Sequence, residues 1–397
     1  MRRQLCLGLI VLWSAAAAAA LAAPYIPASD AVVLERLSLR AADPRGGELR
    51  ELRRQLAQQP GDAGLAVRLA RRYFEEVAAE GDPRYIGYAE AALAPWWNLP
   101  DPPTEVRVMR AVLRQFNHGF DAARADLAAA VVQQPSNGEA WAWLAAIAMV
   151  QARYADARIA CERVAALGSP LIGVACIAGV DSVTGRAGLA AQTLGEALQP
   201  SAPKASDASP PELLWALSRL AEIEDRRGEF AAAEAAYRRA LSLGLVDGYL
   251  QAAYADFLLD RGRPAEVLVL LKERQRSDLL LLRLVLAAQA TQAPEFAAWS
   301  TELAARFDAA RQRGDTAHQK EESRFSLAVR GDKARAMTLA GENFAVQREP
   351  ADARVLLEAA LAAGQPAAAG PALQWMAASG IESRILHSLA ARLKGKP

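Results

Sequence analysis

Residues 138–171 read GEAWAWLAAIAMVQARYADARIACERVAALGSPL, and the spacing inside this stretch decides the fold. Larger side chains stand at internal positions 4, 7, 17 and 24, and alanines stand at positions 8 and 20. The residues at these positions are Trp141, Leu144, Tyr154 and Cys161, together with Ala145 and Ala157. Alanine lets two helices approach closely, while the larger residues fill the space around the contact.

The same spacing returns at a fixed period along the chain. The block that starts at Thr104, 34 residues earlier, places Ala111 and Ala123 at the two small positions. Further copies start near Leu171, Leu214 and Gly248. The pattern weakens after these copies, and residues 382–394 read as an amphipathic helix that would cap the end of the array.

This 34-residue arrangement resembles the tetratricopeptide repeat (TPR), a pair of antiparallel helices. The resemblance covers roughly residues 48–394 and is strongest between residues 104 and 271. It implies an all-α fold, a right-handed superhelical solenoid of antiparallel helix pairs, of the kind found in exported bacterial TPR proteins. No alternation of apolar and polar residues predicts strands instead.

The expected organisation is N-terminal TPR-like repeats over residues 48–198 and C-terminal repeats with a capping helix over residues 212–394. Between them, residues 199–211 (QPSAPKASDASPP) form a Pro/Ser-rich loop, because this composition neither continues a helix nor buries a core. Another Pro-rich segment, APWWNLPDPP, contains Trp96 and Trp97. These tryptophans either pack against the nearest helices or form an aromatic shelf for a ligand.

The first 22 residues resemble a secretory signal peptide, because two arginines precede an uncharged apolar stretch that ends in small residues at Ala22. We expect cleavage after Ala22, an extended segment over residues 23–47, and a mature protein in the bacterial periplasm. The alternative is an uncleaved anchor, since the apolar stretch is about long enough to span a bilayer. A membrane is an expected partner only in that case.

Composition and motifs argue against several functional classes. The chain has 46 Lys and Arg residues and 45 Asp and Glu residues, so its net charge is +1. This charge is too small to attract nucleic acid by an overall electrostatic field. The cysteines and histidines show no metal-ligand spacing, so neither a metal nor a cofactor is expected. Without a phosphate loop, a nucleophile elbow or a dinucleotide fingerprint, we expect no enzyme. The alternative is an enzyme or a small-ligand-binding subunit with a cleft near Trp96–Trp97 or His318–Glu321.

Two cysteines remain after signal removal, Cys161 and Cys176. They flank the turn Gly168-Ser169-Pro170 at nearly equal distances, so they lie at about the same height on two antiparallel helices. In an oxidising compartment paired thiols tend to cross-link, and this favours a disulfide. The alternative is two small buried residues at positions where the repeat prefers small side chains.

In a solenoid of helix pairs the first helices line a concave groove. The TPR resemblance implies that positions 2, 5, 9, 12 and 13 of each repeat face this groove and bind a protein or peptide. The residues so implied are Val108, Val112, Phe116, Met149, Trp215, Glu222, Asp225, Tyr249, Asp256 and Asp260. The first four make an apolar wall, and the others make an acidic wall edged by aromatic side chains.

Such a groove suits a partner with a hydrophobic segment and a basic end. The alternative is that the superhelix itself covers the apolar wall and that the charges only keep the face soluble. The sequence therefore predicts an exported interaction scaffold whose partner is a protein or peptide. A role in the assembly or export of an envelope component is a further hypothesis by analogy of fold.

Signal cleavage is tested by N-terminal sequencing of the protein purified from its natural host. We expect a mature chain that begins at Ala23, because the small residues before this position suit signal peptidase. A chain that still begins near Met1 would contradict this prediction and would favour the membrane anchor.

Overall fold

The computed structural model describes residues 44–80 and 84–395, and every regular element in these ranges is a helix. The predicted signal peptide (residues 1–22) and most of the predicted extended segment lie outside the described residues. The chain divides into a first unit, Met1–Gly47, of which the structure describes only the start of α1, and a second unit, Glu48–Pro397.

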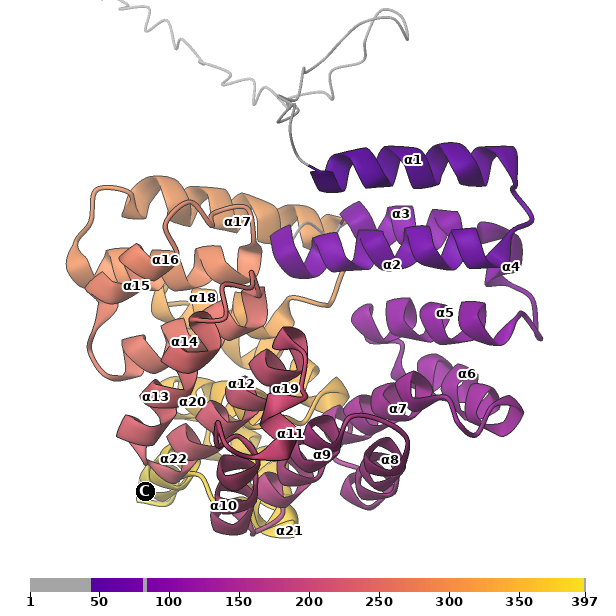
Figure 1. Cartoon of the computed structure of the whole chain (residues 1–397). Coiled ribbons are helices and arrows are strands. Elements are labelled where there is room, and N and C mark those ends of the chain that lie inside the picture. Colours follow the sequence, from indigo (N-terminus) through magenta and orange to yellow (C-terminus); the bar gives the residue numbers. More distant parts are fainter. Residues whose placement is uncertain (1–43, 81–83, 396–397) are drawn as a thin grey trace, which may run out of the picture. The chain divides into compact units, whose positions relative to one another are not determined.

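The helices follow one another with short turns (Figure 1). In chain order they are α1 (Pro44–Gln58), α2 (Ala63–Glu80), α3 (Arg84–Ala92), α4 (Ala94–Trp97), α5 (Thr104–Phe116), α6 (Phe120–Gln133), α7 (Gly138–Val150), α8 (Tyr154–Leu167), α9 (Pro170–Val183), α10 (Ala187–Ala197), α11 (Pro203–Ser206), α12 (Pro210–Arg227), α13 (Phe230–Leu241), α14 (Gly248–Asp260), α15 (Pro264–Leu270), α16 (Asp278–Thr291), α17 (Phe296–Gln312), α18 (Gln319–Ala328), α19 (Lys333–Val346), α20 (Pro350–Ala363), the 3₁₀ helix η1 (Pro366–Ala369), α21 (Gly370–Ser379) and α22 (Arg384–Lys394).

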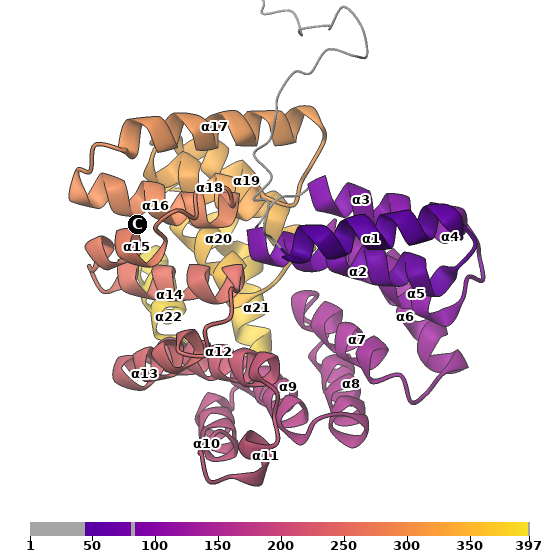
Figure 2. The same ribbon diagram turned by 45° about the horizontal axis from the view of Figure 1, so that its top comes forward.

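Successive helices pack as pairs: α2 with α3, α5 with α6, α7 with α8, α9 with α10, α12 with α13, α14 with α15, α16 with α17 and α18 with α19. Figure 2 shows these pairs stacked one after another along the chain. Three of the predicted repeats begin where a helix begins, at Thr104, Gly138 and Gly248. The prediction of an all-α, TPR-like solenoid is confirmed.

The small positions of the repeat are buried where the two helices of a pair meet. Ala111, Ala123, Ala145 and Ala157 are each at most 2% exposed. Between neighbouring pairs the approach is closer still: a Cβ added at Gly173 in α9 would lie 2.5 Å from Cα of Ala165 in α8. These positions therefore set the distance between helices, as the sequence spacing predicted.

The Pro/Ser-rich segment before α12 has regular structure of its own. It contains the short helix α11 and ends in a capping box, in which Ser209 and Glu212 satisfy each other's backbone groups at the start of α12. Arg239 of α13 donates a hydrogen bond to the carbonyl oxygen of Leu198 before this segment. One hydrophobic cluster runs from Leu171 to Ala287, so the core is continuous across the segment that separates the two predicted blocks.

The two tryptophans of APWWNLPDPP pack against helices. Trp96 is buried in the cluster formed by α2, α3 and α5, and Trp97 lies beneath the guanidinium of Arg114 at 5.6 Å. Arg110 of α5 donates hydrogen bonds to the carbonyl oxygens of Trp97 (2.6 Å) and Leu99 (2.9 Å). The loop is held by the helices it connects, which is the packing interpretation of the sequence rather than the aromatic shelf.

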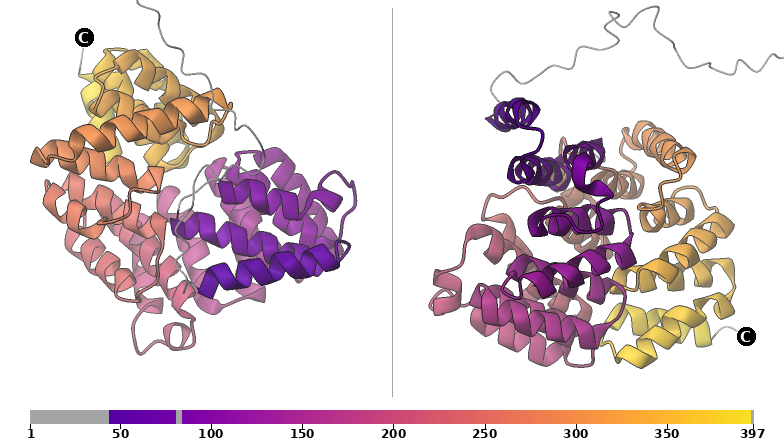
Figure 3. Two further views of the ribbon diagram at one scale, coloured as in Figure 1. Left: turned by 90° about the horizontal axis from the view of Figure 1, so that it is seen from above. Right: turned by 90° about the vertical axis from the view of Figure 1, so that its right-hand side faces the viewer.

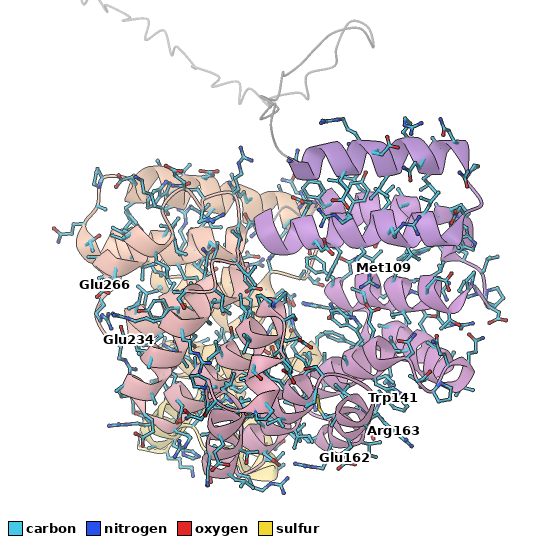
Figure 4. The ribbon with its side chains drawn as sticks, viewed as in Figure 1. Met109, Trp141, Glu162, Arg163, Glu234 and Glu266 are labelled. Carbon is cyan, nitrogen blue, oxygen red and sulfur yellow. A yellow bond between two sulfur atoms is a disulfide. The ribbon has the colours of Figure 1, made fainter. Side chains whose placement is uncertain are left out.

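Ion pairs add to the packing on the outer face. Arg263, which precedes α15, contacts Glu234 of α13 at 2.8 Å and Glu266 of α15 at 2.6 Å; Figure 4 labels the two glutamates. The hydrogen bond from Arg263 lowers the pKa of Glu234 to about 2. In the same figure Arg163 lies over the ring of Trp141, 5.9 Å from its centroid, and so covers an apolar surface of α7.

Cys161 in α8 and Cys176 in α9 are joined by a disulfide, with their Cα atoms 5.4 Å apart. The bond crosses the turn between two helix pairs. None of the helices in the described ranges is long and apolar enough to cross a membrane.

Replacing both Cys161 and Cys176 by serine should lower the free energy of unfolding by about 3 kcal/mol, because the closed 15-residue loop then gains conformational freedom in the unfolded chain. Urea unfolding with and without reductant measures the change, and reductant should have no effect on the double variant. Two free thiols in the denatured, unreduced mature protein would show that the bond does not form.

Candidate functional site

The apolar wall predicted from the sequence is covered in part by the chain itself. Val108 and Val112 are each 2% exposed and belong to the core around α5. Phe116 packs edge-on against Phe74 of α2, with 6.1 Å between ring centroids. Met149 packs against the cluster built by α19–α22. Val108 and Val112 are therefore not a free binding surface, and Phe116 and Met149 are partly buried against other helices of the same chain.

The acidic wall is largely neutralised, again by the chain itself. Asp256 of α14 pairs with Arg283 of α16 at 2.6 Å and with Arg324 of α18 at 2.9 Å. Burial alone would raise the pKa of Asp256, but these two cations outweigh burial and hold the pKa below its usual range. Asp260 pairs with Arg354 of α20 at 2.6 Å. The C-terminal helices thus place arginines against the acids that the sequence assigned to a partner.

Four of the predicted groove residues lie together on α12 and α14. Glu222 accepts hydrogen bonds from Arg219 at 3.0 Å and from the hydroxyl of Tyr249. Arg219 also lies over the ring of Trp215, 5.7 Å from its centroid. Burial, with the nearby charge of Asp260, raises the pKa of Asp225. Tyr249 is 56% exposed, so this cluster reaches the surface.

The second cleft proposed from the sequence, near His318 and Glu321, is an ion-paired interior rather than an open site. Glu321 is 5% exposed. Burial would raise its pKa, but the charges of Lys320 and Arg283 outweigh burial and lower it. Within the described ranges, no group of three or more His, Cys, Asp or Glu side chains could hold a metal ion.

The last helices contact helices that precede them by about two hundred residues. Arg348 donates its backbone N–H to the carbonyl oxygen of Val150 at 2.8 Å. Trp375 donates its indole N–H to the hydroxyl of Tyr154 at 2.8 Å, and Glu382 accepts the backbone N–H of Ala187 at 2.9 Å. Helices α19–α22 therefore pack against the segment from α7 to α10; in Figure 3 this segment is magenta and the last helices are orange to yellow.

A hollow of about 580 Å³ lies where these distant segments meet. One side is the turn between α7 and α8, and the other side is formed by α19, α20 and α21. Its lining residues are Ala152, Tyr154, Gly341, Phe344, Ala345, Arg348, Leu356, Ala368, Pro371, Gln374, Trp375, Ala378 and Ser379. Most of these residues are apolar. The volume of the hollow is in the usual range for small-molecule sites.

Tyr154 and Arg348 supply hydrogen-bond donors to the hollow, while the polar groups of Gln374 and Ser379 can both donate and accept. Tyr154 accepts the hydrogen bond from Trp375 and donates its own hydroxyl proton to no acceptor in the described part of the chain. Burial raises the pKa of Tyr154 to about 12, so the hydroxyl stays protonated. Arg348 is exposed and its guanidinium forms no ion pair with any residue of 44–80 or 84–395. The lining contains no carboxylate.

Sequence reasoning did not find this hollow. Tyr154 was recognised, but only as a large residue at position 17 of a repeat. Phe344 and Trp375 lie in the weakest repeats, and nothing in their local spacing says that they meet a turn near residue 152. The one signal in the sequence is that Phe344 and Trp375 are large aromatic residues in C-terminal repeats that are rich in alanine.

The helix pairs and the half-buried hollow define this chain as a TPR-like helical solenoid with an apolar cavity. Its sequence matches no protein-family model and no curated protein. Among solved structures it is similar to a human IFIT1 dimer with m7Gppp-AAAA, at 14% identity over 89% of this chain and 87% of that chain, with a TM-score of 0.40.

Two further solved structures are similar to this chain at the same low sequence identity. A structure of Naa15/Naa10 bound to HypK-THB is 14% identical in sequence, with a TM-score of 0.31. The match covers 90% of this chain and 61% of that chain. The P58(IPK) TPR domain shows 14% identity over 82% of this chain and 95% of that chain, with a TM-score of 0.20. With these TM-scores, the assignment of the fold rests on the helix pairing in this chain.

Asp256→Asn should lower the free energy of unfolding near neutral pH by about 2 to 4 kcal/mol, because it leaves Arg283 and Arg324 without their shared carboxylate. The folded-state pKa of Asp256 lies below its unfolded value of about 3.9, so this contribution is present above pH 4 and is lost as the pH falls through the folded pKa. The difference in Tm between wild type and variant should therefore narrow from pH 5 towards pH 2.

Asp121→Asn is the matched control, since the side chain of Asp121 is 85% exposed. It should change Tm little at any pH. An Asp256→Asn variant as stable as wild type at pH 7 would show that Asp256 is not held by these arginines in solution.

Proposed function

We propose that this chain is a protein-interaction scaffold in the bacterial periplasm, exported through its N-terminal signal segment. The observation that supports it best is the pair of aromatic residues Trp215 and Tyr249. They stand at equivalent positions of two repeats; Tyr249 is 56% exposed, and Trp215 is partly exposed while its other side packs against the core. Extended arrays of helix pairs commonly use such surfaces to bind other proteins.

The neighbourhood of Tyr249 fits a protein contact. Leu245 and Val246, in the turn before α14, are 38% and 49% exposed. Together with Tyr249 they place three large apolar side chains at the surface within five residues of chain, beside the carboxylate of Glu222. An aromatic and aliphatic surface next to a polar rim is typical of protein interfaces. We propose a partner segment with an apolar side chain at its centre.

Two features support the export part of the proposal. The first 22 residues have the charge and hydropathy pattern of a signal peptide. The disulfide between Cys161 and Cys176 suits an oxidising compartment. A role in the assembly or export of an envelope component is consistent with this location and rests on analogy of fold alone.

The proposal assigns no catalysis to the chain. The two clefts that an enzyme could have used are occupied: Trp96 is packed in the core, and Glu321 is buried between cations. The alternative function, a small-ligand-binding subunit, is favoured at neither of these two clefts.

A photo-crosslinking amino acid at position 249 tests the scaffold surface in living cells. We expect a discrete protein adduct at Tyr249, because this side chain is exposed beside other apolar residues. The matched control is position 269 on α15, where Val269 is also exposed but belongs to the second helix of its pair. Equal labelling at both positions, or no adduct at position 249, would contradict the assignment of this surface.

A further inference from the structure

We propose that the hollow between the α7–α8 turn and helices α19–α21 binds a small apolar carboxylic acid. The apolar body would lie against Phe344, Leu356 and Trp375, and the carboxylate would receive hydrogen bonds from Arg348 and the hydroxyl of Tyr154. This binding site is separate from the surface around Tyr249, so it goes beyond the proposed function.

The walls of the hollow favour an apolar body. Phe344 and Trp375 meet edge to face with 6.2 Å between centroids, so together they present a fixed aromatic corner. Leu356 and several alanines complete the lining. A volume of about 580 Å³ suits a ligand with an aryl or alkyl group of moderate size. Filling this space with apolar atoms removes exposed apolar surface from water.

The charge at the hollow favours a carboxylate. Arg348 is the one charged residue of the lining, and its guanidinium has no ion-pair partner in the described ranges. A carboxylate can accept both from this guanidinium and from the unused hydroxyl proton of Tyr154, and hydrogen bonds to a charged acceptor are stronger than neutral ones. A cationic ligand would instead meet Arg348 with like charge and find no carboxylate.

The nearest acid in the sequence does not compete for Arg348. Glu349 caps α20: its carboxylate accepts the backbone N–H of Asp352, and the side chain of Asp352 accepts the backbone N–H of Glu349 in return. Glu349 is not part of the lining. Glu349 forms no ion pair with Arg348, although its charge adds to burial in raising the pKa of Tyr154, against the opposite effects of Arg226 and Arg348.

The position of the hollow gives the ligand a structural effect. Its lining joins residues 152–154 to residues 341–379, so a bound molecule contacts both segments at once. The backbone hydrogen bond from Arg348 to Val150 and the bond from Trp375 to Tyr154 already join these segments. A ligand that binds only when they are together must stabilise their contact.

Isothermal titration calorimetry with a matched ligand set tests the proposal on the full mature chain. The probes are 4-phenylbutyrate, its neutral amide 4-phenylbutyramide, and the cation 4-phenylbutylamine, which share one apolar body. We expect saturable binding of the acid, with an affinity about tenfold above that of the amide because the charged head adds roughly one strong hydrogen bond. The amine should bind most weakly.

Two variants locate the site. Gly341→Leu should abolish binding, because Gly341 lines the hollow and a Cβ added there meets no atom within 4 Å, so the new side chain fills the space without a clash. The control Gly195→Leu, at a helical glycine of α10 with equally open space, should bind like wild type. Both substitutions remove a glycine from a helix and should leave the fold intact.

Arg348→Met should remove the preference for the acid over the amide while leaving the binding of the amide unchanged. The fold should survive, since the contact of residue 348 with Val150 uses the backbone. The control Arg313→Met removes an exposed arginine after α17, away from the hollow, and should preserve the preference. Circular dichroism checks each variant.

The proposal is overturned by any of four results. These are the absence of saturable binding, equal affinity for all three probes, binding that survives Gly341→Leu, and an acid preference that survives Arg348→Met.

A further titration distinguishes a free carboxylic acid from the C-terminal carboxylate of a protein chain. If an acetylated tetrapeptide with a C-terminal phenylalanine binds more tightly than 4-phenylbutyrate, the ligand is a peptide terminus and the small-molecule assignment is wrong.

Discussion

The close contact between the two helices of each pair is the constraint on which the rest of this structure depends. Ala145 of α7 and Ala157 of α8 are buried against each other's helices, and the same small residues recur in the neighbouring pairs. Because each pair leaves an apolar face uncovered, it is stable only when the next pair covers that face. Repetition of one short contact therefore accounts for the length of the array and for its high alanine content.

A second level of packing is superimposed on this nearest-neighbour order. The C-terminal helices α18–α22 contact helices far from them in the sequence through Asp256–Arg324, Asp260–Arg354 and Tyr154–Trp375. Contacts of this kind are not required by a solenoid, in which each repeat touches only its neighbours. These contacts place C-terminal side chains against much of the predicted groove. They also bring together the residues that line the hollow beside Tyr154.

The two levels also differ in what can be read from the sequence. The starts of α5 and α7 coincide with predicted repeat starts at Thr104 and Gly138, and α14 starts at Gly248, near which a repeat was predicted, since these positions follow from a local period of 34 residues. The start of α12 was placed four residues late, at Leu214 instead of Pro210, because Pro210 and Pro211 resemble a loop and yet suit the first turn of a helix capped by Ser209. The predicted groove residues lie on α5, α7, α12 and α14, the first helices of their pairs, and several of them are packed or ion-paired within the chain.

The sequence by itself determined the helix pairs, because a helix and its partner are encoded within one repeat by residues that are close along the chain. It also carried the spacing that brings Cys161 level with Cys176 across one turn. Only the tertiary structure decided which acids are neutralised and where the free surface and the hollow lie. The physical reason is that small angles between successive pairs accumulate along the array, and their sum, which no local pattern encodes, decides whether distant repeats meet.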